Sequence, residues 1–118
     1  MGLDVFFERH KIVGYFRKVN FLVYYFKELG FDVENQTPLY ITKEQVEELK
    51  NRCEKVLNNH TLAKDLLPTM KGFFFGSTEY DENYYNDVKQ VLQYCETTLL
   101  PMFDELDNRE GIYFNTWY

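Results

Sequence analysis

Five residues near the start of the chain carry the side chains best suited to binding. Arg17 offers a planar fork of donors for a carboxylate or a phosphate, and Lys18 adds a second positive charge beside it. Asn20 can both donate and accept hydrogen bonds, and Tyr24 offers a flat surface with a polar tip. Together with His10, these residues form the predicted binding site. Its small-molecule ligand would be a nucleotide-like anion, paired by the cations and stacked on aromatic rings.

The spacing of Arg17, Asn20 and Tyr24 favours one shared face of a helix, because residues three, four and seven positions apart lie on the same side. This face would lie beside a core-facing stripe, so most of the helix circumference is apolar or aromatic. Such a helix is either buried on two sides or presents one side to a ligand or partner. In the structural alternative, the tyrosine and the arginine stem only cover the core.

The sequence offers little for catalysis. Asp81, Glu82 and Asp87 could form a metal or acid/base pair, but carboxylates early in a helix more often complement its dipole. The segment 72–78 shares two glycines with phosphate-binding loops, yet acidic residues follow it where such a loop needs a lysine. We therefore predict a protein that is not an enzyme and has no catalytic residues. A small hydrolase using Asp81 and Glu82 is the alternative.

The two cysteines, Cys53 and Cys95, each fall on the apolar side of an expected helix. A cysteine in that position behaves as a small hydrophobic residue, so we predict two buried free thiols, with a disulfide as the alternative. Their spacing to His10 and His60 is not that of a metal site. We predict that the protein needs no metal or other cofactor.

Length and charge limit the classes of partner. The 118 residues predict one domain spanning 1–118, and the high share of Leu, Ile, Val and Phe argues against disorder. The net charge of −6 argues against general binding to duplex DNA. Residues 1–18 nevertheless hold four basic and two acidic side chains, so positive charge collects around the predicted site. The absence of a long apolar stretch or a signal peptide predicts a cytoplasmic protein without membrane association.

The first half of the chain predicts the elements that position the site. Residues 3–9 are rich in β-branched and aromatic side chains and predict a strand, after which Gly14 breaks the pattern. Apolar residues recur every three or four positions from 15 to 29, which predicts a helix ending at Gly30. Its core-facing stripe is expected at Val19, Leu22, Val23, Phe26 and Leu29.

The middle of the chain predicts a loop over 31–38, a short extended piece over 39–41 and a second helix. This helix begins at Lys43, because Thr42 and Gln45 match a capping box. It should end in a left-handed turn at residues 58–59, and a short helix over 61–67 stops before a proline.

The last third predicts two strands and a long helix. The three phenylalanines 73–75 predict a central strand with both faces covered. The third helix is capped by Asp81, with Ser77 or Thr78 as the alternative, and it continues past Pro101, where we expect a kink. The β-prone run 111–118 predicts a strand that closes the sheet beside the first one.

Several segments resemble a family of short, functionally uncharacterised proteins of bacteriophages and prophages. They are the opening MGLD, GYFRKVN at 14–20, LLPT at 66–69, GFFFGSTEYDENYYND at 72–87 and the terminal aromatic run. The chain has Val5-Phe6 and Phe16 where members of the family tend to have other residues. The resemblance assigns no site residues. It implies an accessory protein that binds a host component, which could belong to the host's anti-phage defence.

The predicted fold is α+β, with three main helices on one face of a small, mostly antiparallel sheet of three or four strands. The predicted function is inhibition of a host protein through protein–protein contact in the bacterial cytoplasm. A module that sequesters a nucleotide-like anion is the second hypothesis, and a homo-oligomer remains open.

Overall fold

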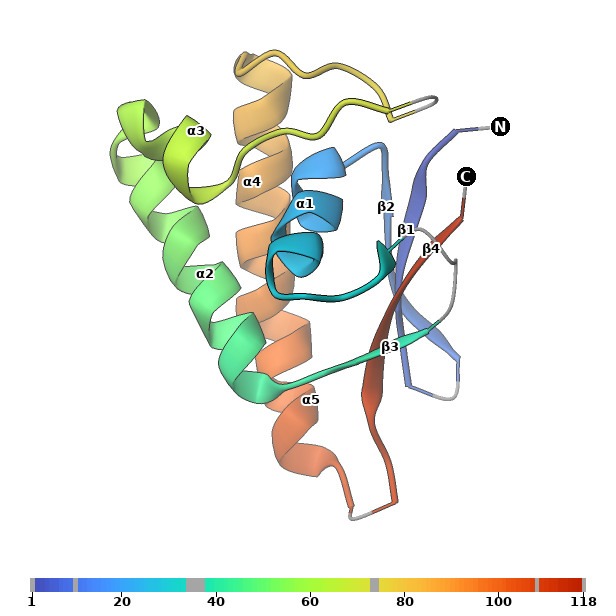
Figure 1. The fold of residues 1–118 in the computed structure, drawn as a ribbon. Helices are drawn as coiled ribbons and strands as arrows, with labels where there is room; N and C mark the ends of the chain where they lie inside the picture. The colour runs from blue at the N-terminus through green and yellow to red at the C-terminus, as the bar shows by residue number, and fades with distance from the viewer. Residues whose placement is uncertain (1, 10, 34–37, 73–74, 108, 118) are drawn as a thin grey trace.

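The computed structural model describes residues 2–9, 11–33, 38–72, 75–107 and 109–117. Within them, the chain forms a four-stranded sheet with its helices gathered on one side (Figure 1). The strand order is β2-β1-β4-β3, and each neighbouring pair is antiparallel. The α+β fold is therefore as predicted, but two of its strands come from unexpected parts of the sequence.

The N-terminal hairpin consists of β1 (Asp4–Glu8) and β2 (Ile12–Arg17). β1 confirms the first predicted strand, whereas β2 takes residues that we expected at the start of a helix. The predicted break at Gly14 is also wrong, since Gly14 pairs with Phe7 inside the strand. A side chain at position 14 would collide with the Tyr94 ring, so glycine lets an α-helix approach the sheet here.

Helix α1 (Asn20–Glu28) begins five residues later than predicted, because pairing with β1 outweighs the helical periodicity before Asn20. The predicted stop is confirmed by Gly30, whose φ of +99° suits glycine. The helix is buried on two sides, rather than presenting one of its two apolar sides to a ligand or partner. Leu29, expected in the core stripe, is exposed, whereas the other predicted positions are buried: Val19, Leu22, Val23 and Phe26.

Strand β3 (Leu39–Ile41) leads directly into α2 (Lys43–Asn58), and both confirm predictions. The capping box at Thr42 is present: its hydroxyl accepts from the Gln45 N–H at 3.2 Å, and the Gln45 side chain accepts from the Thr42 N–H at 2.9 Å. The predicted left-handed end is wrong, because Asn59 is extended with φ −148°. A 3-10 turn, η2 (His60–Leu62), and the short α3 (Ala63–Leu66) follow.

The long C-terminal helix has three parts: α4 (Glu82–Tyr94), the π-helical turn η3 (Cys95–Leu99) and α5 (Leu100–Glu105). It starts as predicted, with the Asp81 carboxylate accepting from the Tyr84 N–H at 3.1 Å. It also continues past Pro101, as expected. The irregularity there is a π turn just before the proline, where the backbone hydrogen-bond pattern changes.

Strand β4 (Ile112–Trp117) lies between β1 and β3, which confirms a C-terminal strand beside the first strand. Of the three phenylalanines expected to form a central strand, Phe75 is not part of this sheet. Phe73 and Phe74 lie outside the described residues, and Phe75 is buried in an irregular segment. The edge positions are filled by β2 and β3 instead.

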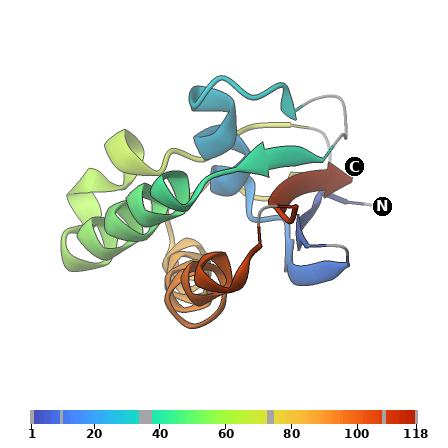
Figure 2. The same ribbon diagram turned by 90° about the horizontal axis from the view of Figure 1, so that it is seen from below.

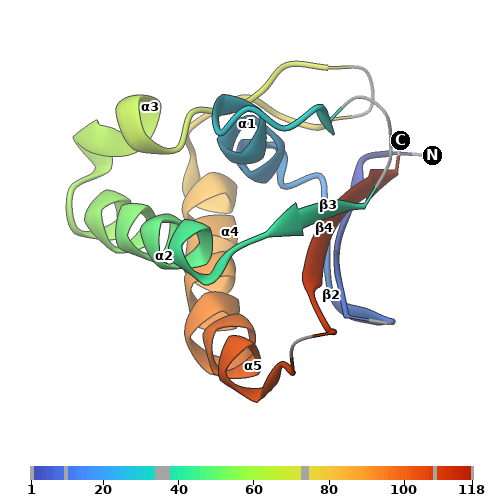
Figure 3. The same ribbon diagram turned by 60° about the horizontal axis from the view of Figure 1, so that its bottom comes forward.

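The helices form two layers over the inner face of the sheet (Figures 2 and 3). α1 and α4 contact the sheet directly: the Phe7 ring lies 6.5 Å from that of Phe26 on α1 and 5.5 Å from that of Tyr94 on α4. α2 packs behind them, with the Tyr25 hydroxyl donating to the Gln45 carbonyl and α2 running against α4. The described residues include no helix long and apolar enough to cross a membrane.

Both cysteines lie in this core as free thiols, as predicted for Cys53 and Cys95. Burial raises the pKa of the Cys53 thiol well above its usual range and the pKa of Cys95 to about 12. Both groups are therefore neutral thiols in the folded protein at ordinary pH, consistent with a packing role.

Candidate functional site

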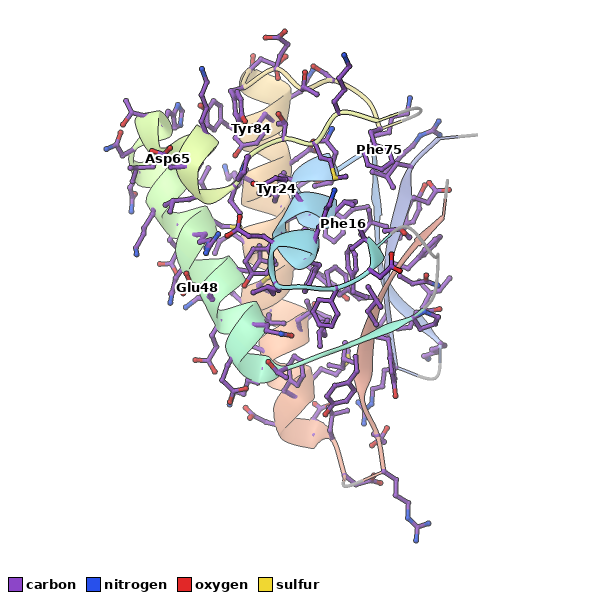
Figure 4. The ribbon with its side chains drawn as sticks, viewed as in Figure 1. Phe16, Tyr24, Glu48, Asp65, Phe75 and Tyr84 are labelled. Atoms are coloured by element: carbon purple, nitrogen blue, oxygen red, sulfur yellow. The ribbon has the colours of Figure 1, made fainter. Side chains whose placement is uncertain are left out.

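The predicted site residues do not share one helix face. Arg17 is the last residue of β2, Lys18 lies in the turn after it, and Asn20 is the first residue of α1. Tyr24 lies on α1 and is half-buried (Figure 4), whereas His10 lies outside the described residues. The spacing argument fails because helical geometry begins only at Asn20, so strand geometry sets the direction of the Arg17 side chain.

Asn20 is a structural clamp. Its side chain is 3 % exposed, and its amide donates to the carbonyls of Phe75 and Ser77, each at 3.0 Å. Its oxygen accepts from the Met70 N–H, also at 3.0 Å. These three bonds hold the segment between α3 and α4 against the start of α1, and they use the polar atoms that we had assigned to ligand recognition.

Lys18 occupies an unusual backbone conformation, with φ +57°, that non-glycine residues adopt uncommonly. Its N–H donates to the Leu3 carbonyl at 2.8 Å, which fixes the turn against β1. Two glycines make room for its aliphatic stem. A Cβ atom at Gly2 would lie 3.2 Å from Lys18 Cε, and one at Gly76 would lie 3.1 Å from Lys18 Cβ.

A pocket of about 160 Å³ opens between this turn and the N-terminal end of α4. The end of β2 and the turn contribute Arg17 and Lys18, the segment before α4 contributes Glu79 and Asp81, and α4 contributes Asp87. The structure thus brings three of the predicted site residues together with carboxylates about sixty positions away in the sequence. Its remaining lining residues are Val19, Asn20, Phe21, Thr69, Gly76, Ser77, Asn83 and Tyr84.

The acidic wall of the pocket includes a partly desolvated group. Burial, and secondarily the charge of Asp81, raise the pKa of the Asp87 carboxyl. Beside it, the Tyr84 hydroxyl donates to the Leu67 carbonyl at 2.8 Å, and burial raises the pKa of this phenol. Tyr84 and Phe75 can be located in Figure 4. The Tyr84 hydroxyl is thus fixed by a hydrogen bond within the protein, whereas burial makes the ionised form of Asp87 less favourable than it is in water.

The outer face of the sheet is a second candidate site. In the described part of the chain, no helix lies on this face (Figure 3). Five large apolar side chains are exposed among the described residues, and four of them belong to the sheet: Ile12, Tyr15, Tyr40 and Tyr113. The fifth, Leu29, lies at the end of α1. The sheet is therefore where this protein concentrates its exposed apolar surface.

Cross-strand contacts hold the exposed rings in place. Tyr40 and Tyr113 face each other in register with ring centroids 5.8 Å apart. Tyr15 lies 5.4 Å from the Phe6 ring, and its hydroxyl donates to the Asp4 carboxylate at 2.8 Å. The hydrogen bond to Asp4 raises the pKa of Tyr15. These paired rings form a partly ordered surface rather than a set of free side chains.

The sequence does not predict this face, because the helical periodicity that starts at residue 15 includes the end of β2 in the expected helix. The signal that favours a strand is the alternation of residues with a period of two, which continues from 4–8 into 12–17. Aromatic residues occur at both alternating sets of positions, so the alternation does not separate an inner face from an outer face. The carboxylates of the pocket were considered only as a local group. Asp81 does cap α4, which confirms its predicted structural role, but its place in the same pocket lining as Arg17 depends on the tertiary fold.

Comparison of the chain with protein-family models, with curated proteins and with solved structures finds no match. The assignment of function therefore rests on the two candidate sites.

Proposed function

We propose that this protein is a non-enzymatic binding protein that docks a protein partner on the outer face of its sheet. The observation that carries the proposal is the concentration there of exposed Ile12, Tyr15, Tyr40 and Tyr113. Tyrosine suits such a role, because it combines a large flat contact area with a polar tip and loses little conformational entropy on binding. The cross-strand pairing of Tyr40 with Tyr113 reduces that loss further.

The edge of the sheet adds a second binding feature. The Lys18 N–H donates to the Leu3 carbonyl, so Lys18 occupies a hydrogen-bonded position of the β1–β2 pair. Such positions alternate along an antiparallel strand, and the backbone N–H and C=O groups of Arg17 and Tyr15 therefore point away from β1. β2 is an edge strand, and these groups are available to a partner's extended segment. The partner would thus meet both a ring-lined face and polar backbone groups.

The resemblance to phage and prophage proteins makes a host protein the expected partner, and inhibition of a host factor, such as a defence component, the expected effect. The hydrolase alternative has less support, because Asp81 is engaged as the cap of α4. A nucleotide-like anion in the pocket also has less support, since Glu79, Asp81 and Asp87 would repel it.

The test is capture of a partner from lysate of a bacterial host by immobilised protein, compared among variants. Tyr40→Ser and Tyr15→Ser should each weaken capture of the same partner at least tenfold. Leu29→Ser is the matched control, because it removes an exposed apolar side chain that lies off the sheet. Equal capture by all three variants would contradict the proposal. Sedimentation analysis gives a second test. If the unmodified chain sediments as a dimer and Tyr40→Ser as a monomer, the outer face binds a second copy of this chain, which would contradict a host partner.

A further inference from the structure

Strand β2 presents an uncovered edge. No residue of β2 is buried, whereas its neighbour β1 alternates between buried and half-buried residues. The backbone groups of Tyr15 and Arg17 point away from β1, and within the described residues no further strand lies beside them. Each of these two residues offers one N–H donor and one carbonyl acceptor. The edge can therefore pair with one more strand.

The segment that carries this edge is basic. Residues 9–18 hold four basic side chains and no acidic one, although the whole chain has a net charge of −6. Arg9 is paired with Glu110 at 2.9 Å. Lys11, just before β2, and Arg17, its last residue, take part in no ion pair among the residues that the structure describes. The edge thus carries two cations that are free to meet a partner's carboxylates.

The Arg17 side chain belongs to the outer face of the sheet. It shares this face with Tyr15, because alternate residues of a strand lie on the same side. Asp4 lies opposite Arg17 across the β1–β2 pair, but its carboxylate accepts a hydrogen bond from the Tyr15 hydroxyl at 2.8 Å instead of forming an ion pair with Arg17. A strand added on the free side of β2 would lie about 4.8 Å away, so its carboxylate would be within reach of Arg17.

An apolar cavity of about 560 Å³ adjoins the other end of β2. Val13 of β2 and Met102 of α5 supply its apolar lining, beside Arg9, Lys11 and Glu110. Arg9 and Glu110 pair with each other, so among these described lining residues Lys11 is the cation without an ion pair. A side chain that entered the cavity from an added strand would therefore meet an apolar surface next to a positive charge.

We propose that β2 pairs with an acidic, extended segment of the protein partner, which adds a fifth strand to the sheet. The inference rests on the proposed partner binding and names the element that the partner supplies. Carboxylates at the two ends of the segment pair with Arg17 and Lys11, and apolar side chains between them pack toward Val13 and Met102. Backbone hydrogen bonds to Tyr15 and Arg17 supply affinity, and the charged ends supply selectivity.

A second copy of this chain is a less favourable occupant. Antiparallel pairing of β2 with the β2 of another copy would place two basic segments side by side, with Lys11 of each copy near the Arg17 end of the other. Like charges on neighbouring strands destabilise their pairing. An acidic segment replaces this repulsion by attraction at both ends, so the charge of β2 favours a different protein as the partner.

The experiment is titration of the full chain with three synthetic peptides, followed through the amide NMR signals of the protein. EVTVTVE has acidic ends, KVTVTVK reverses the charge, and EVTPTVE has proline in place of the central valine. Each sequence reads the same in both directions, so it fits a parallel or an antiparallel added strand. EVTVTVE should bind at least tenfold more tightly than either of the others, because KVTVTVK is repelled and proline lacks an N–H for the ladder. The amide signals of Tyr15 and Arg17 should shift, and those of β3 should not.

A charge reversal in the protein tests the two cations. Lys11→Glu combined with Arg17→Glu should reverse the preference, so that KVTVTVK binds at least tenfold more tightly than EVTVTVE. Lys27→Glu combined with Lys55→Glu is the matched control, because it changes the net charge equally at exposed positions on α1 and α2. This control should retain the preference for EVTVTVE. Circular dichroism melts show whether each variant is folded. If the Lys11 and Arg17 double variant does not fold, Lys11→Glu alone replaces it and should reduce the preference at least threefold.

Four results would overturn the inference. They are no binding of EVTVTVE at about 5 mM, where even weak sites fill, equal binding of EVTPTVE, an unchanged preference in the Lys11 and Arg17 variant, and amide shifts confined to β3. Equal binding of the proline peptide would mean contact without strand pairing. Shifts confined to β3 would place the added strand on the opposite edge of the sheet.

Capture of the host partner separates this inference from the proposed function. If Tyr40→Ser loses the partner while the Lys11 and Arg17 variant captures it fully, the outer face binds the partner and the inference about the edge is wrong. If Tyr40→Ser and Tyr15→Ser capture the partner normally while EVTVTVE binds to β2 as expected, the proposed outer-face contact is wrong and the edge is the binding site.

Discussion

The two faces of the sheet use similar residues in opposite ways. On the inner face, Phe7 and Phe114 are at most 1 % exposed, and they pack against α1 and α4. On the outer face, Tyr40 is 58 % exposed, and Tyr113 faces it across the strands. Alternation in these strands therefore leaves aromatic rings on both faces, and on the outer face they lie among polar residues such as Asp4, Glu8 and Asn115. The exposed rings of the outer face are the surface on which the proposed partner contact depends.

Removal of the strand that contributes to both faces should have the largest effect. β4 pairs with β1 on one side and β3 on the other, so a fragment that ends at Glu110 loses both ladders together with Ile112 and Phe114 from the core. The loss exceeds what a domain stability of roughly 5–15 kcal/mol can sustain. We expect no cooperative melt by circular dichroism. A melt close to that of the full chain would show that β4 is dispensable.

The comparison of faces is sharpened by one substitution on each face of β4. Phe114→Ala should lower the free energy of unfolding by about 3–5 kcal/mol, because it leaves a cavity between the Phe7 and Phe26 rings. Tyr113→Ala should cost less than about 1 kcal/mol, since it removes only a cross-strand pair. Urea unfolding measures both values. Equal losses would mean that the outer face is part of the stabilising core.

The start of α1 offers a second contrast, between a clamp and a free side chain. Asn20→Ala should cost about 2 kcal/mol, because it leaves buried backbone groups in the 70–77 segment without their partner. Arg17→Ala should cost less than about 1 kcal/mol, as exposed substitutions usually do. Thermal melts can rank the two variants. A larger loss of stability for Arg17→Ala than for Asn20→Ala would mean that the Arg17 stem stabilises the fold by covering the core.

The buried thiols predict a loss of stability in alkaline solution. Folding raises the pKa of Cys95 from an ordinary 9.0 to about 12, so only the unfolded chain releases this proton between those values. Stability is therefore complete below pH 9.0 and falls as pH rises, by about 1.4 kcal/mol per pH unit for this thiol. Cys95→Ala should flatten the dependence measured by urea unfolding. An unchanged slope would exclude Cys95 as its source.

Local signals in the sequence predict much of the fold. The caps at Thr42 and Asp81 and the stop at Gly30 depend on neighbouring residues, and all three are confirmed. β2 could not be separated from α1, because its aromatic residues fit both a helical stripe and a strand until the pairing with β1 is known. Of the strand expected at 73–75, the described residue Phe75 is buried without joining the sheet, so an apolar run predicts burial here but not strand pairing.

The candidate sites were less predictable than the fold. Arg17 and Lys18 were identified by their chemistry, and they do line a pocket. The carboxylates that line the same pocket follow the segment that Asn20 holds in place, and its three long-range hydrogen bonds cannot be predicted from residue spacing. The outer face could not be predicted, because the sequence does not show which of the two alternating sets of aromatic residues is covered by helices. The packing of α1 and α4 on the sheet decides this.

Oxidative footprinting by hydroxyl radicals, read by mass spectrometry, tests the central claim most directly. The protein is labelled alone and then with its captured partner bound. Binding on the outer face predicts that Tyr15, Tyr40 and Tyr113 become protected while Leu29, exposed away from the sheet, is labelled as before. Protection of Leu29 with unchanged labelling of the three tyrosines would place the partner elsewhere and contradict the account.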